Sequence, residues 1–195
     1  MPVLYLLHGM HGDHMSWLNG SAIGRYARAL KIAVIMPSVG NSFYCNMKYG
    51  GRYHDYVASE LPEYIGKLLP FITKKREKTF IAGLSMGGFH SMQISKEYPT
   101  MFEYVGLFSA AIFRGKEGVE TYADTEAKLE RQFNEGVKLY WIGIGKDDFL
   151  YDENVRYRAL LDSEGYPYTY RESEGGHIWR NWRIYLGEYA QLLFK

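Results

Sequence analysis

Short apolar runs alternate with segments of helical periodicity along the whole chain, and this alternation constrains the fold more than any other feature of the sequence. Several runs are apolar at nearly every position, as expected for parallel strands that are buried on both faces. The expected strands are residues 2–7, 31–37, 78–84, 103–110, 137–145 and 166–172. The expected helices are residues 21–31, 53–69, 86–98, 124–134, 152–164 and 179–194, and Pro62 is expected to kink or restart the second of them. The alternation predicts a mostly parallel sheet with helices on both faces.

Length and charge narrow the class of protein. A chain of 195 residues fits one domain, residues 1–195, with a substantial core. The net charge of +1 offers no electrostatic footprint for nucleic acid or an anionic membrane, and no apolar run approaches the ~20 residues of a membrane helix. The single cysteine, Cys45, excludes a disulfide within the chain, and "MPVLYLLHG" lacks the basic region of a signal peptide. We therefore expect a cytoplasmic protein.

The segment "FIAGLSMGGFH" (80–90) carries the clearest chemical signal. An apolar strand pattern runs into Gly83-Leu84-Ser85-Met86-Gly87, and a helical pattern follows. A Gly-x-Ser-x-Gly sequence at a strand-to-helix junction holds its serine in a tight turn that pushes the hydroxyl out of the sheet. The alternative is a plain turn between a strand and a helix. We interpret Ser85 as a catalytic nucleophile.

A serine hydroxyl needs a neighbouring base, and the C-terminal half supplies candidates. In hydrolases of this architecture the acid and then the histidine follow the serine along the chain. Asp147 and Asp148 come after a strand that ends near Gly145, and His177 lies in a glycine-rich loop after the last strand. The alternatives are a helix N-cap for the aspartates, a role that Asp152 suits better, and a surface position for the histidine. The spacing alone does not choose between Asp147 and Asp148.

Four segments resemble one known family in the right order. They are "PVLYLLHGMHGDHMSWL", "AGLSMGGFHSM", "GKDDFLYDEN" and "GGHIWRNWR". Together they resemble the esterase D and S-formylglutathione hydrolase-like branch of the α/β-hydrolases, over nearly the whole chain. The resemblance implies a Ser-His-Asp triad of Ser85, His177 and Asp148, because the family's acid directly precedes a Phe-Leu-like pair.

The same resemblance gives a role to the turn "LLHGMHGDH" (6–14). In the family the first strand of this type ends in a His-Gly turn, and the residue after the glycine points its backbone N–H into the active site. That residue is Met10 here. The resemblance therefore implies that the N–H groups of Met10 and Met86 form the oxyanion hole, where each donor contributes ~3 kcal/mol to lowering the barrier.

The histidines of this turn also raise the possibility of a metal site. Metallo-β-lactamase-like hydrolases carry His-x-His-x-Asp-His after a strand. Here His8, His11, Asp13 and His14 have one residue too many between the first two histidines. We therefore expect no metal and no cofactor, with His8 packed under the turn and His11 and His14 near the mouth of the cleft.

The substrate is the least constrained feature. The loops 11–20, 41–53 and 111–123 are expected to wall the pocket, and core packing or surface exposure is an equal alternative for each candidate lining residue. The candidates are Trp17, Phe43, Tyr44, Tyr49, Phe149 and Trp179. Because no large inserted lid is visible, we expect a shallow site for short acyl groups, acetyl or butyryl, with a sugar as one candidate alcohol. Feruloyl esters and S-formylglutathione are alternative substrates, and an acyltransferase would use the same triad.

The start of the chain departs from the family. Family members place two strands before the one that leads to the His-Gly turn, so we expect a sheet that lacks them. The run Ile32 to Met36 would then lie at a sheet edge, and a bare apolar edge templates association. We expect a second copy to cover this edge through a two-fold axis, which makes the protein at least a dimer. A covering upstream segment is the alternative.

Overall fold

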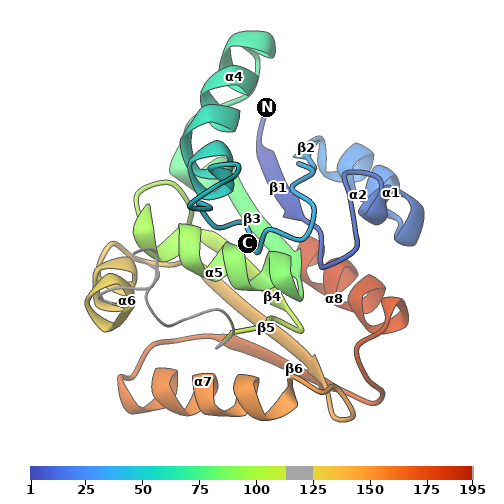
Figure 1. Cartoon of the computed structure of the whole chain (residues 1–195), viewed down its shortest axis with the longest axis vertical. Helices are drawn as coiled ribbons and strands as arrows, with labels where there is room; N and C mark the ends of the chain where they lie inside the picture. Colours follow the sequence, from blue (N-terminus) through green and yellow to red (C-terminus); the bar gives the residue numbers. More distant parts are fainter. Residues whose placement is uncertain (113–124, 195) are drawn as a thin grey trace.

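A computed structural model of the protein describes residues 1–112 and 125–194 (Figure 1). Six strands form one sheet in the order β2-β1-β3-β4-β5-β6, and every neighbouring pair is parallel. The strands are β1 Val3–Leu7, β2 Ala33–Ile35, β3 Thr79–Leu84, β4 Tyr104–Phe108, β5 Leu139–Gly145 and β6 Thr169–Ser173. The predicted α/β architecture with a mostly parallel sheet is confirmed.

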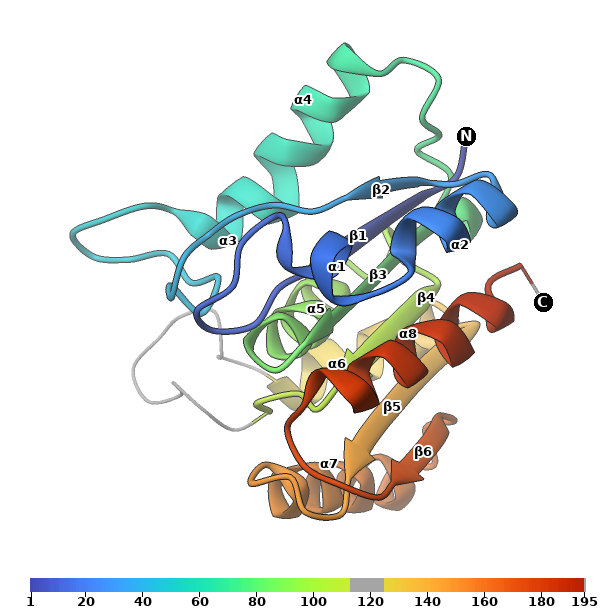
Figure 2. The same ribbon diagram turned by 90° about the vertical axis from the view of Figure 1, so that its right-hand side faces the viewer.

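Helices cover both faces of this sheet. The helices are α1 Ser16–Gly20, α2 Ile23–Leu30, α3 Tyr53–Asp55, α4 Leu61–Leu68, α5 Met86–Glu97, α6 Thr125–Asn134, α7 Tyr151–Ser163 and α8 Trp179–Leu192, with a π-helical segment η1 Tyr56–Glu60 and a short 3-10 turn η2 Arg76–Lys78. Helices α1, α2 and α8 pack on one face, which is turned toward the viewer in Figure 2, and α4 to α7 pack on the other. No helix within the described ranges combines the length and the apolar character needed to cross a membrane.

The central strands are buried on both faces, which explains their continuous apolar sequences. Every residue of β1, β3 and β4 is buried. Along β3, Phe80 faces the core beneath α8 and Ile81 faces the core beneath α5. Full burial of such a side chain stabilises the fold by roughly 1.5–3 kcal/mol. The two cores therefore fix β3 and α5, the two elements that meet at Ser85.

The predicted helix over residues 53–69 is interrupted, and Pro62 explains where it restarts. Pro62 is the second residue of α4, a position at which its missing N–H costs no helical hydrogen bond. The turn before it is π-helical, with the Leu61 N–H donating to the carbonyl of Tyr56. Helix α1 was not predicted, because its five residues lie in a segment interpreted as irregular and carry no side-chain cap. Most of the predicted wall loop 111–123 lies outside the described residues.

The strand predicted over residues 31–37 is shorter and lies at one edge of the sheet. Only Ala33–Ile35 pair with β1, and the strand begins late because Lys31 adopts a left-handed conformation that closes α2. Among the described residues, no strand precedes β1 and none pairs with the outer side of β2. The edge position expected for this run is therefore confirmed.

Candidate active site

Ser85 lies at the junction of β3 and α5 in a conformation that few residues adopt. Its φ and ψ angles are 53° and −116°. A non-glycine residue in such a region carries roughly 1–3 kcal/mol of strain, which the surrounding structure must offset. The side chain is half-buried, so its hydroxyl is within reach of a ligand.

Two glycines make this junction possible. A Cβ added at Gly83 would lie 2.4 Å from the carbonyl carbon of Gly87. A Cβ added at Gly87 would lie 2.6 Å from the carbonyl oxygens of both Leu7 and His8. The start of α5 therefore packs directly on the end of β1, where the His-Gly turn begins.

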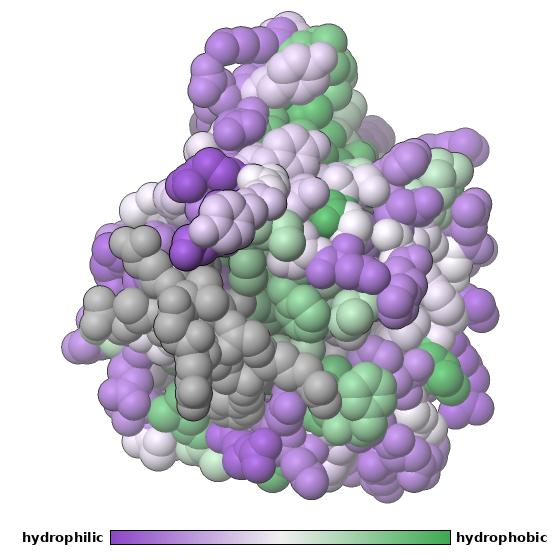
Figure 3. Space-filling view, viewed as in Figure 1, coloured by the Kyte–Doolittle hydropathy of each residue, from purple (hydrophilic) through white to green (hydrophobic). Residues whose placement is uncertain are grey.

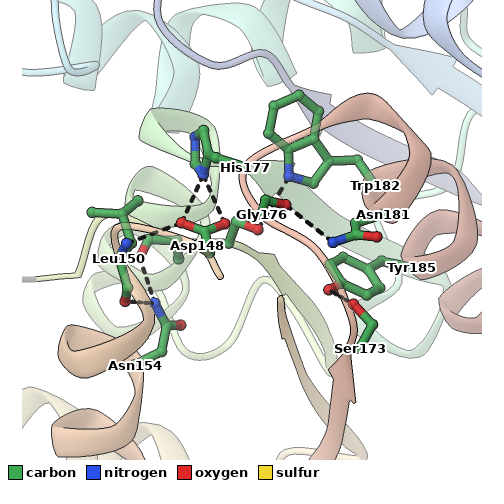
Figure 4. Close-up of polar contacts among 11 residues, drawn as sticks. Asp148, Leu150, Asn154, Ser173, Gly176, His177, Asn181, Trp182 and Tyr185 are labelled. Carbon is green, nitrogen blue, oxygen red and sulfur yellow. Dashed lines mark hydrogen bonds and ion pairs between the residues drawn. The ribbon is translucent and has the colours of Figure 1, made fainter. Parts of the chain in front are cut away.

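His177 faces the carboxylate of Asp148. The His177 Nδ1 lies 2.9 and 3.0 Å from the two carboxylate oxygens, and the Asp148 side chain has no exposed surface (Figure 4). One of these oxygens also accepts the Leu150 N–H at 2.9 Å. Because a carboxylate can only accept, Nδ1 carries the proton and Nε2 is left as the second ring nitrogen. Asp147 is exposed, so the aspartate implied by the family resemblance is the one that contacts the histidine.

The loop that carries His177 is held from several sides. Gly175 has a φ of +85°, and a Cβ on Gly145 would lie 2.0 Å from the Gly175 carbonyl oxygen. The buried Asn181 side chain donates from Nδ2 to the Gly176 carbonyl at 3.0 Å. Close contact with the end of β5 and this hydrogen bond fix the path of the loop toward the imidazole.

Ser85 and His177 line the same cavity, whose volume is about 600 Å³. Met10 and Phe149 also line it, together with Trp179. Phe149 packs on the His177 ring with a centroid distance of 4.6 Å. The walls are thus mainly apolar around a serine and an imidazole.

Four of the six predicted lining residues do not reach this cavity. Trp17 is buried in the core, where its indole N–H donates to the Leu7 carbonyl at 2.9 Å. Tyr44 is also buried, with its hydroxyl on the His8 carbonyl at 3.0 Å. Tyr49 is 90% exposed and lies off the cavity. The first two are held in the core because a buried indole or phenol needs a hydrogen-bond acceptor, which the strand-end carbonyls supply.

Phe43 packs against Phe89 in the core, with ring centroids 6.4 Å apart, and is likewise absent from the cavity wall. Sequence reasoning missed Trp182, which does line the cavity and packs on His177 at 5.0 Å. The available signals were its position one helical turn after Trp179 and its place in the segment "GGHIWRNWR".

The resemblance implies an oxyanion hole formed by the backbone N–H groups of Met10 and Met86. Met86 is the first residue of α5, and Met10 follows the His-Gly turn at the cavity wall. Among the described residues, neither N–H has a backbone acceptor. The first N–H groups of a helix and its dipole favour an anion.

His8 is packed under the turn, as expected. Its Nδ1 lies 2.7 Å from the Gly9 carbonyl and its Nε2 accepts the Val39 N–H at 3.2 Å. Burial lowers the pKa of His8, which favours the neutral ring that this pattern requires. Both ring nitrogens of His8 are hydrogen-bonded, so the ring has no lone pair for a metal. His11 and His14 are exposed, and His11 also lines the cavity. Within the part of the chain that the structure describes, no three His, Cys, Asp or Glu side chains gather into a metal-binding group.

A strained serine after a parallel strand shares a cavity with a histidine that contacts a buried aspartate, and this arrangement defines an α/β serine hydrolase. Residues 1–190 match the Esterase family, described as "Putative esterase". The chain belongs to this esterase family, in its esterase D and S-formylglutathione hydrolase-like branch, and is a serine carboxylesterase.

Individual relatives agree with this assignment. An acetyl esterase of Caldicellulosiruptor saccharolyticus is 33% identical over 225 aligned residues, which cover 100% of this chain and 84% of that protein. Two solved structures from Staphylococcus aureus, the fluorophosphonate-binding serine hydrolase FphF and the S-formylglutathione hydrolase FrmB, superpose with TM-scores of 0.87 and 0.86. Each is 29% identical, and the match covers 100% of this chain and 84% of theirs.

The contrast between the adjacent aspartates gives a direct test. We expect Asp148→Asn to lower kcat by roughly 10⁴-fold, because an amide no longer selects the tautomer with the proton on Nδ1. The matched variant Asp147→Asn changes an exposed side chain and should leave kcat near the parent value. Steady-state kinetics of the two variants on p-nitrophenyl acetate makes the comparison, and a larger loss for Asp147→Asn would contradict the assignment.

Proposed function

We propose that residues 1–195 form a single α/β-hydrolase domain that hydrolyses short-chain acyl esters through Ser85, His177 and Asp148. The observation that carries the proposal is the contact between His177 Nδ1 and the buried Asp148 carboxylate, on the cavity that Ser85 also lines. That contact directs the remaining ring nitrogen, Nε2, to act as the base.

The chemistry then runs in two halves. The Ser85 hydroxyl oxygen attacks the acyl carbonyl carbon while His177 Nε2 takes its proton. The carbonyl π electrons move to oxygen, and the N–H groups of Met10 and Met86 stabilise the oxyanion. When the carbonyl re-forms, the C–O bond to the alcohol breaks and His177 returns the proton to that alcohol. Water repeats the sequence on the acyl-enzyme, and no cofactor enters.

Asp148 acts on the imidazole throughout these steps. Its negative charge stabilises the imidazolium without accepting the proton. Because the carboxylate is excluded from water, this interaction is stronger than it would be at the surface.

An acetyl or butyryl group is the proposed acyl group, and an acylated saccharide is one candidate substrate. The acetyl esterase relative supports the acetyl group. Phe149 and Trp179 lie on the cavity wall, where aromatic side chains can pack on the apolar face of a sugar ring. A cytoplasmic location is also proposed, since one cysteine forms no disulfide within the chain.

A substrate panel tests this proposal. We expect kcat/KM to fall about tenfold or more between p-nitrophenyl butyrate and octanoate, as the short-chain proposal requires. Acetylated xylan, methyl ferulate and S-formylglutathione complete the panel. In the presence of an added alcohol, a new ester indicates acyl transfer and the free acid indicates hydrolysis. Ser85→Ala is the control and should be inactive throughout. Rising activity with chain length, or a clear preference for methyl ferulate, would contradict the short-chain proposal.

The edge strand supports the proposal of a dimer. The Ala33 N–H donates to the Pro2 carbonyl, so the neighbouring Val34 N–H points to the outer side of β2. Helix α4 projects from the molecule beside this edge, and apolar surface is visible on it at the top of Figure 3. Its residues Tyr64 and Leu68 are 62% and 58% exposed. We propose that β2 pairs antiparallel with β2 of a second copy.

Light scattering at micromolar concentration should therefore give the mass of a dimer. Val34→Pro removes the outward N–H, which an edge strand tolerates, and should give a monomer with an unchanged fold. A monomeric parent protein, or a Val34→Pro variant that remains dimeric, would contradict pairing through β2.

A further inference from the structure

The segment that leaves β4, Phe108 to Ala111, holds the backbone of Ser85 from both sides. The Ser85 N–H donates to the Phe108 carbonyl at 2.8 Å, and the Ala111 N–H donates to the Ser85 carbonyl at 3.2 Å. The segment is fully buried, with Ser109 at 0% exposure. We call residues 108–111 the β4 connector. Its two hydrogen bonds fix the peptide groups on both sides of the Ser85 Cα.

The β4 connector also reaches His177, through Trp182. The Trp182 indole N–H donates to the Ser109 hydroxyl oxygen at 3.1 Å. The indole ring contacts the His177 ring nearly perpendicularly, at 85° and a centroid distance of 5.0 Å, and Figure 4 shows the two side by side. With Phe149 also packed on the imidazole, the orientation of His177 depends on where Trp182 is anchored.

A third branch leads to Asp148. The fully buried Asn154 donates from Nδ2 to the Ala110 carbonyl at 3.0 Å and to the Leu150 carbonyl at 2.9 Å. The Leu150 N–H in turn donates to the Asp148 carboxylate (Figure 4). The β4 connector thus lies one hydrogen bond from Ser85, two contacts from His177 and three hydrogen bonds from Asp148.

Ser109 itself has a backbone that would suit glycine. Its φ is +46°, and its N–H donates to the Gly143 carbonyl at 2.8 Å. A non-glycine residue at positive φ is uncommon and strained. Glycine at this position could not accept the hydrogen bond that the Ser109 hydroxyl accepts from the Trp182 indole N–H.

We propose that Ser109 and Trp182 are positioning residues that set the spacing between the Ser85 and His177 side chains. The inference rests on the proposed function, because it takes Ser85 as nucleophile and His177 as base. Small displacements of reacting groups cost large factors in rate: about 1 Å can cost 10²-fold. Ser109 itself does not line the cavity, so we expect loss of its hydroxyl to lower kcat more than it raises KM.

The variant Ser109→Gly tests this with little risk to the fold, since it removes the hydroxyl and the backbone strain together. We expect kcat to fall roughly tenfold or more, with KM and the melting temperature close to the parent values. Trp182→Phe keeps an aromatic ring beside His177 but lacks the N–H, and should lower kcat by a similar factor. Ser95→Ala, a buried serine on α5 whose hydroxyl bonds the Met92 carbonyl, is the matched control and should leave kcat unchanged.

The double variant decides whether the effect runs through the Ser109–Trp182 hydrogen bond. If it does, Ser109→Gly combined with Trp182→Phe is no slower than the slower single variant. Rates are expressed per site titrated with a fluorophosphonate, which removes any effect of unfolded protein. An unchanged kcat in Ser109→Gly, or two single effects that multiply, would overturn the inference. Activity that persists in Ser85→Ala would instead overturn the proposed function.

Discussion

The rest of the active site depends on the close approach of the β3–α5 turn to the end of β1. Glycine at positions 83 and 87 lets backbone pack on backbone, with no side chain between the strand, the helix and the His-Gly turn. This packing holds Ser85 at a positive φ and brings the first amide of α5 near the turn that carries Met10. The strained backbone of Ser85 is therefore held by tight packing around it, and the two hydrophobic cores stabilise that packing.

Local sequence predicts the parts of this arrangement that local geometry dictates. The apolar strand, the Gly-x-Ser-x-Gly turn and the helix after it follow from residues 79–97 alone, and the glycines at 175 and 176 mark the loop of His177. The spacing could not separate Asp147 from Asp148, because both follow β5. The prediction that Asp152 suits the N-cap of α7 was wrong. The N-cap residue is Leu150, and its N–H donates to the carboxylate of Asp148.

Residues whose role depends on distant partners could not be predicted. Trp17 and Tyr44 carry the side chains expected of a pocket wall, but their polar groups find strand-end carbonyls in the core instead. Ser109 and Trp182 are 73 residues apart, and although Trp182 lies in the segment "GGHIWRNWR", nothing local links it to Ser109. Where a buried polar atom finds its partner is decided by the packing of helices on the sheet, which residue types along the chain do not specify.

A crystal structure of the protein inhibited by a fluorophosphonate tests the central claim most directly. We predict a covalent bond between Ser85 Oγ and phosphorus. We also predict that the phosphoryl oxygen lies about 2.7–3.1 Å from the backbone nitrogens of Met10 and Met86. Phosphorus bound to any other residue, or a phosphoryl oxygen turned away from both amides, would contradict this claim.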